Sequence, residues 1–124
     1  MPAKVVDASV VAAIAFGEPR AGEARALVEG CDLVAPPLLA YELTGVARKK
    51  ALHYPSERDR ILALLRDARS LSIRWEEVDH PAVLDLALAT GLTTYDAAYL
   101  FLARSLGLPL ATLDERLRRH ARGP

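Results

Sequence analysis

The sequence predicts an α/β fold, with three layers in α/β/α order and a short parallel sheet in the middle. Short apolar runs alternate along the chain with segments of helical spacing, and the connections between them are short. Alternation of this kind is typical of βαβ units, whose helices cover both faces of a parallel sheet. The chain has 124 residues without an internal repeat or a low-complexity linker, so we expect a single domain over residues 1–124.

Four apolar stretches are the candidate strands, at residues 4–6, 33–35, 71–75 and 108–113. The third alternates apolar and polar residues, which predicts a half-exposed strand at an edge of the sheet. The first and the last lead directly into aspartates, Asp7 and Asp114.

Seven further segments have helical spacing or composition: 8–16, 20–29, 38–52, one that begins at Ser56, one that starts at 79–81 and ends at Gly91, one that follows Thr94 and ends at 106–107, and the charged segment after Asp114. Ser56 with Asp59 three residues later resembles a capping box and predicts a helix start there. Thr94 is the predicted N-cap of the helix that carries Asp96 in its first turn. Residues 97–103 are all apolar, so we expect this helix in the middle of the protein.

The composition excludes several classes of protein. A single cysteine, Cys31, rules out an internal disulfide and a cysteine-based zinc site. No apolar run approaches the ~20 residues that span a bilayer. The N-terminal residues, in which Asp7 interrupts the apolar run, do not form a signal peptide. We therefore expect an intracellular, cytoplasmic protein that does not contact a membrane.

Four acidic residues are candidates for one site. Asp7 and Asp114 end strands, and ligands of open parallel sheets bind outside the carboxyl ends of the strands. Glu42 lies in the second turn of the helix after the second strand, beside its apolar stripe rather than opposite it. Asp96 opens the apolar helix, although its position at the same edge does not follow from the preceding segment. Each of the last two acids has an alternative interpretation. Glu42 could simply reach water from the edge of a buried face, and Asp96 could simply stabilise a helix N-terminus.

Several carboxylates at one edge would raise the pKa values of one another and need a counter-charge. A divalent cation provides it. Mg²⁺ or Mn²⁺ takes carboxylate oxygens as ligands and keeps several waters, which leaves room for a phosphate oxygen.

Four motifs together resemble the PIN domain: VVDASV at 5–10, LAYEL at 39–43, TTYDAAYL at 93–100 and LATLDERL at 110–117. The short length makes the chain similar to the VapC toxins of bacterial and archaeal toxin–antitoxin pairs. This resemblance covers essentially the whole chain. It implies a Mg²⁺- or Mn²⁺-dependent endoribonuclease that is a homodimer. It also implies neutralisation by a small VapB-like antitoxin, which in the family often presents a basic side chain to the acidic pocket.

The resemblance assigns roles to individual residues. The catalytic set would be Asp7, Glu42, Asp96 and Asp114. Of these, the three aspartates would hold the metal directly or through water, and Glu42 would position or deprotonate the attacking water. Three hydroxyl residues, Ser9, Thr94 and Thr112, would support them.

The chain departs from some relatives after the last motif aspartate. Where these relatives carry a further acid, this chain has Arg116 and Leu117, and Glu115 is expected to point elsewhere. We therefore expect four acids rather than five, and not two tightly held metal ions.

Basic residues are balanced by acids, 16 against 16, so a role in RNA binding would need local patches. Two candidates exist, Arg48-Lys49-Lys50 and the C-terminal arginines, and from them Arg48, Lys49 and Arg116 are the candidate RNA contacts. A solvated helix end explains each equally well.

Other function classes fit the residues less well. An aspartate-nucleophile phosphatase needs a second aspartate where this chain has Ser9, and both it and a receiver domain need a lysine after Lys50. Two alternatives stay open: a catalytically silent PIN-like module that binds RNA or protein, and an RNA-processing nuclease without an antitoxin. A silent module is expected to lose one or more of the four acids, and all four are present.

Overall fold

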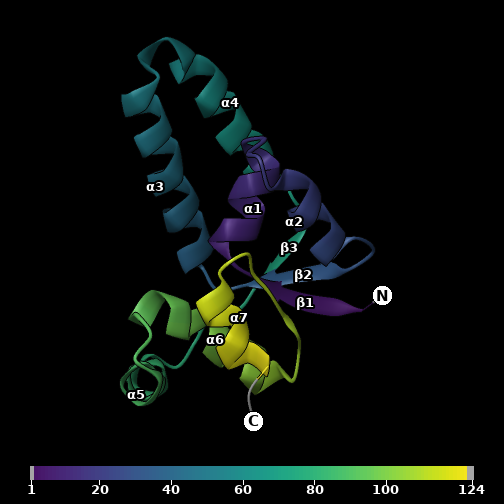
Figure 1. Ribbon diagram of the computed structural model, residues 1–124, viewed down its shortest axis with the longest axis vertical. Coiled ribbons are helices and arrows are strands. Elements are labelled where there is room, and N and C mark those ends of the chain that lie inside the picture. The colour runs from purple at the N-terminus through teal and green to yellow at the C-terminus, as the bar shows by residue number, and fades with distance from the viewer. Residues whose placement is uncertain (1, 123–124) are drawn as a thin grey trace.

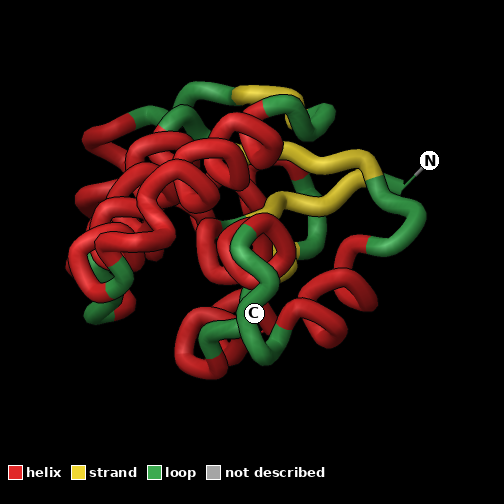
Figure 2. Tube along the Cα trace, turned by 90° about the horizontal axis from the view of Figure 1, so that it is seen from above, coloured by secondary structure: helices red, strands yellow, loops and turns green. Residues whose placement is uncertain are grey.

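The structure is a computed structural model that describes residues 2–122. Along the chain the elements are β1 (Ala3–Val6), α1 (Ala8–Ala15), α2 (Ala21–Val28), β2 (Asp32–Ala35), α3 (Leu38–His53), η1 (Pro55–Glu57), α4 (Arg58–Arg69), β3 (Ile73–Trp75), α5 (His80–Thr90), α6 (Thr94–Leu106), β4 (Leu110–Ala111) and α7 (Glu115–Arg122). Helices make up most of the molecule and the strands are short (Figure 2).

The sheet is parallel throughout and has the order β3-β2-β1-β4. Strand β3 lies at one edge, as its alternating sequence predicted. The chain crosses to the other side of β1 after β3, so the strand order reverses between β1 and β4. In open α/β sheets, ligands bind at such a reversal, outside the carboxyl ends of the strands.

Helices cover both faces of the sheet. Helices α1, α2, α3 and α4 pack on one side, whereas α5, α6 and α7 lie on the other, with α6 against β1 and β4 (Figure 1). The predicted three-layer α/β/α fold is therefore confirmed. Within residues 2–122 no single helix is long and apolar enough to span a bilayer. Helices α5 and α6 together have the required length and apolarity, but they are bent by 108° relative to each other.

The apolar helix lies in the core as predicted. Six of the seven residues from Ala97 to Ala103 are buried and Phe101 is half-buried. Two glycines end the helices of this pair, Gly91 after α5 and Gly107 after α6, and adopt φ values of 75° and 65°. Glycine tolerates this left-handed conformation without steric cost.

Two predicted helix starts are wrong. Thr93, not Thr94, is the N-cap of α6, because the Thr93 hydroxyl accepts the Asp96 N–H at 3.1 Å. The predicted capping box at Ser56 is not formed either. A 3₁₀ turn that begins at Pro55 includes Ser56, and α4 starts at Arg58 without a side-chain cap.

Strand β4 is shorter than predicted, at Leu110–Ala111 instead of 108–113. Pro109 has no N–H to donate to the sheet. At the other end, the N–H groups of Leu113 and Asp114 donate to side-chain hydroxyls instead of a neighbouring strand. The strand therefore ends early because the site described next uses its backbone.

Candidate metal centre at the carboxyl end of the sheet

Asp7 lies at the end of β1 and is held by three donors. It is the N-cap of α1 and is only 5% exposed. Its Oδ1 accepts the Ser9 hydroxyl at 2.6 Å and the Val10 N–H at 3.3 Å, and its Oδ2 accepts the Thr112 hydroxyl at 2.5 Å. Burial raises the pKa of Asp7, these hydrogen bonds oppose the increase, and the charge of Asp96 adds to it.

The two hydroxyls also connect Asp7 to the segment after β4. Ser9 Oγ accepts the N–H of Leu113, and Thr112 Oγ1 accepts the N–H of Asp114, each at 3.0 Å. A continuous set of hydrogen bonds thus runs from the Asp7 carboxylate to the backbone of Asp114. Ser9 and Thr112 orient one acid and fix the backbone of another.

Asp114 is exposed and lies at the start of α7, where its Oδ1 accepts the Leu117 N–H at 3.1 Å. The turn that carries it is fixed from outside by two arginines. Arg20 donates to the carbonyl of Leu113 at 3.0 Å, and Arg118 donates to the carbonyl of Thr112 at 2.7 Å. The sequence did not predict these two contacts: Arg20 reaches a carbonyl 93 positions away, and the C-terminal arginines, which include Arg118, were candidates only for a basic patch.

Asp96 is half-buried in the first turn of α6. Burial raises its pKa, and the charge of Asp114 raises it further. The hydrogen bond with Thr93 and the charge of Arg116 act in the opposite direction. Because Asp114 influences this pKa, the structure brings Asp96 to the same edge of the sheet as the strand-end aspartates.

Glu42 extends from the second turn of α3 and accepts the hydroxyl of Tyr99 on α6 at 2.5 Å. Burial raises the pKa of Glu42, and the charges of Asp7 and Asp96 raise it further, whereas the hydrogen bond with Tyr99 lowers it. Tyr99 is 1% exposed, and both burial and Glu42 raise its pKa well above the ordinary value. Sequence reasoning missed Tyr99, although a buried tyrosine in an apolar helix needs a hydrogen-bond partner.

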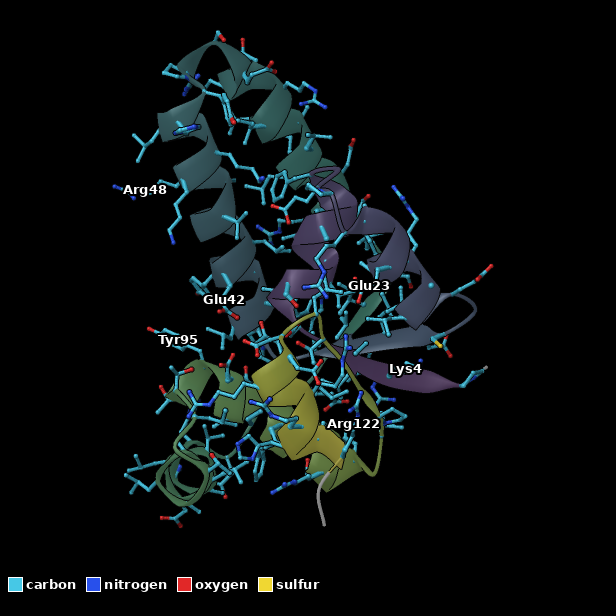
Figure 3. The ribbon with its side chains drawn as sticks, in the orientation of Figure 1. Lys4, Glu23, Glu42, Arg48, Tyr95 and Arg122 are labelled. Atoms are coloured by element: carbon cyan, nitrogen blue, oxygen red, sulfur yellow. The ribbon has the colours of Figure 1, made fainter. Side chains whose placement is uncertain are left out.

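The four carboxylates therefore share one region of negative charge. Among residues 2–122 none of them forms an ion pair with a basic side chain. Three of them stand at the N-termini of α1, α6 and α7, where helix dipoles offset part of the repulsion. The fourth, Glu42, lies deeper along α3 (Figure 3).

The donor set fits a hard divalent cation. It consists of carboxylate oxygens with neighbouring hydroxyls, and the buried Asp7 has no basic side chain paired with it among the described residues. In the described part of the chain, no three His, Cys, Asp or Glu side chains are close enough together to surround one ion. An ion held here would keep several waters and contact the carboxylates partly through them, as Mg²⁺ commonly does.

The other predicted residues lie at different distances from this region. Thr94 is exposed and is not the cap. Arg116 donates to the carbonyl of Gly91 at 2.8 Å and is near enough to lower the pKa of Asp96. Arg48 and Lys49 are exposed on α3, and Figure 3 shows Arg48 pointing away from Glu42. The helical rise of about 1.5 Å per residue separates these two positions by about 9 Å along the axis.

Glu115 does not join the acidic region. It faces Arg118 at 3.4 Å and Arg122 at 3.9 Å. The four acids that the sequence singled out therefore influence one another through their charges, whereas Glu115 is paired with arginines instead.

Comparisons with known proteins agree with this architecture. The model of the PIN domain matches residues 4–123. Ribonuclease VapC3 of Pyrobaculum aerophilum is 36% identical in an alignment 119 residues long, which covers 91% of this chain and 90% of the relative.

Two solved structures are similar. PAE2754 from Pyrobaculum aerophilum matches with a TM-score of 0.79 and 29% identity, over 98% of this chain and 81% of that one. VapC20 of Mycobacterium tuberculosis, a sarcin–ricin loop cleaving toxin, matches with a TM-score of 0.69 over 94% of both chains, but its 18% identity supports the fold alone. The family predicted from the four motifs is confirmed: this chain belongs to the PIN-domain family and is a homologue of a VapC ribonuclease.

Proposed function

We propose that this protein is a Mg²⁺- or Mn²⁺-dependent endoribonuclease and the toxin of a VapBC-type pair. The observation that carries the proposal is the group of four carboxylates, unpaired with any described cation, at the point where the strand order reverses. Similarity to a VapC ribonuclease over 91% of the chain supports RNA as the substrate.

The four acidic residues would have different roles in hydrolysis. Asp7, Asp96 and Asp114 would hold the metal directly or through water. When bound, such an ion would supply a better water nucleophile and offset charge on the phosphodiester. Glu42 orients the attacking water and accepts its proton, a role that suits a carboxylate whose pKa is raised towards neutrality. In-line attack on phosphorus breaks the bond to the 3′ oxygen and leaves a 5′-phosphate and a 3′-hydroxyl.

The test is cleavage of structured RNAs by the purified protein with Mg²⁺ and then with EDTA. We expect cleavage with Mg²⁺ only, and its loss in Asp96→Asn. Asp79→Asn is the matched control, because Asp79 also lies at the N-terminal end of a helix, as the N-cap of α5, and does not contribute to the acidic region. Unchanged cleavage in EDTA, or by Asp96→Asn, would contradict the metal site.

The partners are also part of the proposal. A basic side chain of a small antitoxin would complement the four acids, and a short DNA-binding protein encoded just upstream would support this role. A homodimer in the cytoplasm follows from the same resemblance. The side chain of Leu88 on α5 is 75% exposed and offers an apolar contact to a second copy. Light scattering of the purified protein tests the dimer.

A further inference from the structure

Two exposed tyrosines stand next to the acidic residues. Tyr41 immediately precedes Glu42 on α3, and Tyr95 immediately precedes Asp96 on α6. Their exposed fractions are 77% and 60%. Neither ring contributes to the core, so packing does not explain an aromatic residue at either position.

Both tyrosines line one pocket of about 470 Å³ between the N-terminal ends of α3 and α6 and the start of α5. Its walls are apolar and include Pro37, Val83 and Ala98, whereas Glu77 and His80 bring polar groups to it. An apolar pocket of this volume with a few polar groups is typical of a site for a small planar ligand.

The pocket and the acidic region share the same two helices. The hydrogen bond from Tyr99 to Glu42 joins α6 to α3 one helical turn after Tyr95. Figure 3 shows Glu42 and Tyr95 on the facing ends of α3 and α6. A ligand in the pocket would therefore lie beside whatever occupies the acidic region.

We infer that this pocket binds a base of single-stranded RNA next to the phosphodiester that is cleaved, with Tyr41 and Tyr95 stacking on it. The inference rests on the proposed function and extends it, since it names the structural form of the substrate. Stacking on aromatic side chains is the general way in which proteins hold unpaired bases, and it requires a base that is free of a duplex. The polar groups of Glu77 and His80 face the pocket, where a base edge offers donors and acceptors.

The charges favour RNA over a second copy of this chain as the occupant. A symmetric dimer through this pocket would bring the same patch of both copies together, including Glu42 and Asp96 of each. Juxtaposed like charges oppose such an interface. An RNA base is neutral, so the acidic residues do not repel it. It is also linked to the phosphodiester that would be cleaved at the acidic region.

The experiment compares two fluorescently labelled oligonucleotides of equal length and charge. One is a single-stranded RNA of mixed sequence, and the other has the same ribose-phosphate backbone without bases. Binding is measured by anisotropy in EDTA with the variant Asp96→Asn plus Asp114→Asn, which does not cleave and repels phosphate less. We expect this protein to prefer the RNA that carries bases.

Adding Tyr41→Leu and Tyr95→Leu should reduce this preference about 5- to 150-fold, the range that corresponds to loss of stacking on one base. Adding Tyr41→Phe and Tyr95→Phe should retain it, because phenylalanine keeps the ring. Circular dichroism confirms that both proteins are folded.

Equal binding of the two oligonucleotides, at any affinity, overturns the inference, and so does a preference that survives the leucine changes. If the leucine changes instead convert a dimer into monomers and leave the preference intact, the pocket is an interface between copies. Because no cleavage is measured, the result is separate from the test of the nuclease activity.

Discussion

Replacing Thr112 by valine should destabilise the metal-free protein by about 2–4 kcal/mol. The Thr112 side chain is 1% exposed and its hydroxyl makes two hydrogen bonds, one donated to the Asp7 carboxylate and one accepted from the Asp114 N–H. A bond to a charged group contributes about 1.5–3 kcal/mol and a neutral one about 0.5–1.5 kcal/mol. Valine has the same shape as threonine, so the loss reports the hydrogen bonds rather than a cavity.

The assay is urea unfolding in EDTA, followed by circular dichroism. Thr112→Ser keeps the hydroxyl and should lose only about 1 kcal/mol, for the missing methyl group. Thr90→Val is the matched control for the chemical change. The Thr90 hydroxyl also donates one bond, to the Leu86 carbonyl, and accepts one, from the Leu92 N–H, but neither involves a charge. Thr112→Val should therefore cost more than Thr90→Val.

The pH adds a second criterion. Without the Thr112 donor, the pKa of Asp7 should rise further, so the cost should shrink as the pH falls and Asp7 becomes protonated. Two results would refute the idea that this hydroxyl stabilises a charged Asp7. One is a Thr112→Val protein that is no less stable than Thr90→Val, and the other is a loss of unfolding free energy that does not depend on pH.

Three further predictions concern the acids. The midpoint temperature of thermal unfolding in EDTA should decrease as the pH rises through the raised pKa values of Asp7, Glu42 and Asp96, because the native state binds more protons than the unfolded state there and this stabilisation is lost as the protons leave. Scanning calorimetry measures this midpoint. Asp96→Asn should make it less dependent on pH, and a steeper dependence in this variant would contradict the raised pKa of Asp96. Mn²⁺ at 100 times its dissociation constant should stabilise the protein by about 2.7 kcal/mol. Titration calorimetry of Asp7→Asn plus Asp96→Asn should detect no binding, so a normal isotherm would argue against a site on these residues. Tyr99→Phe removes the bond that lowers the pKa of Glu42, so the acidic limb of the pH–rate profile should move to higher pH, and an unmoved limb would exclude Glu42 as the base.

The sequence was sufficient for the fold because its signals are local. Apolar runs that end in Asp7 and Asp114 identify strands and their carboxyl ends without knowledge of the rest of the structure. The errors have local causes too. Two adjacent threonines compete to cap α6, and the chain geometry after Gly91 selects Thr93 over Thr94. Pro109 and two side-chain acceptors shorten β4 below its apolar length.

The supporting contacts of the acidic region were harder to predict because they join distant parts of the chain. Arg20 reaches the Leu113 carbonyl across 93 positions, and Tyr99 reaches Glu42 across 57. No periodicity or cap signal specifies such pairs. Only the buried hydroxyl of Tyr99 hinted at a partner, since burial without a hydrogen bond is costly.

The hydrogen bonds between Asp7 and the segment after β4 make the acidic region depend on parts of the chain that are far apart. Asp7 and Thr112 are separated by 105 positions. A truncated chain that ends before Leu110 lacks both β4 and the hydroxyl that binds Asp7. The acidic region is therefore expected to form only after β4 has paired with β1, and such a fragment should lack it.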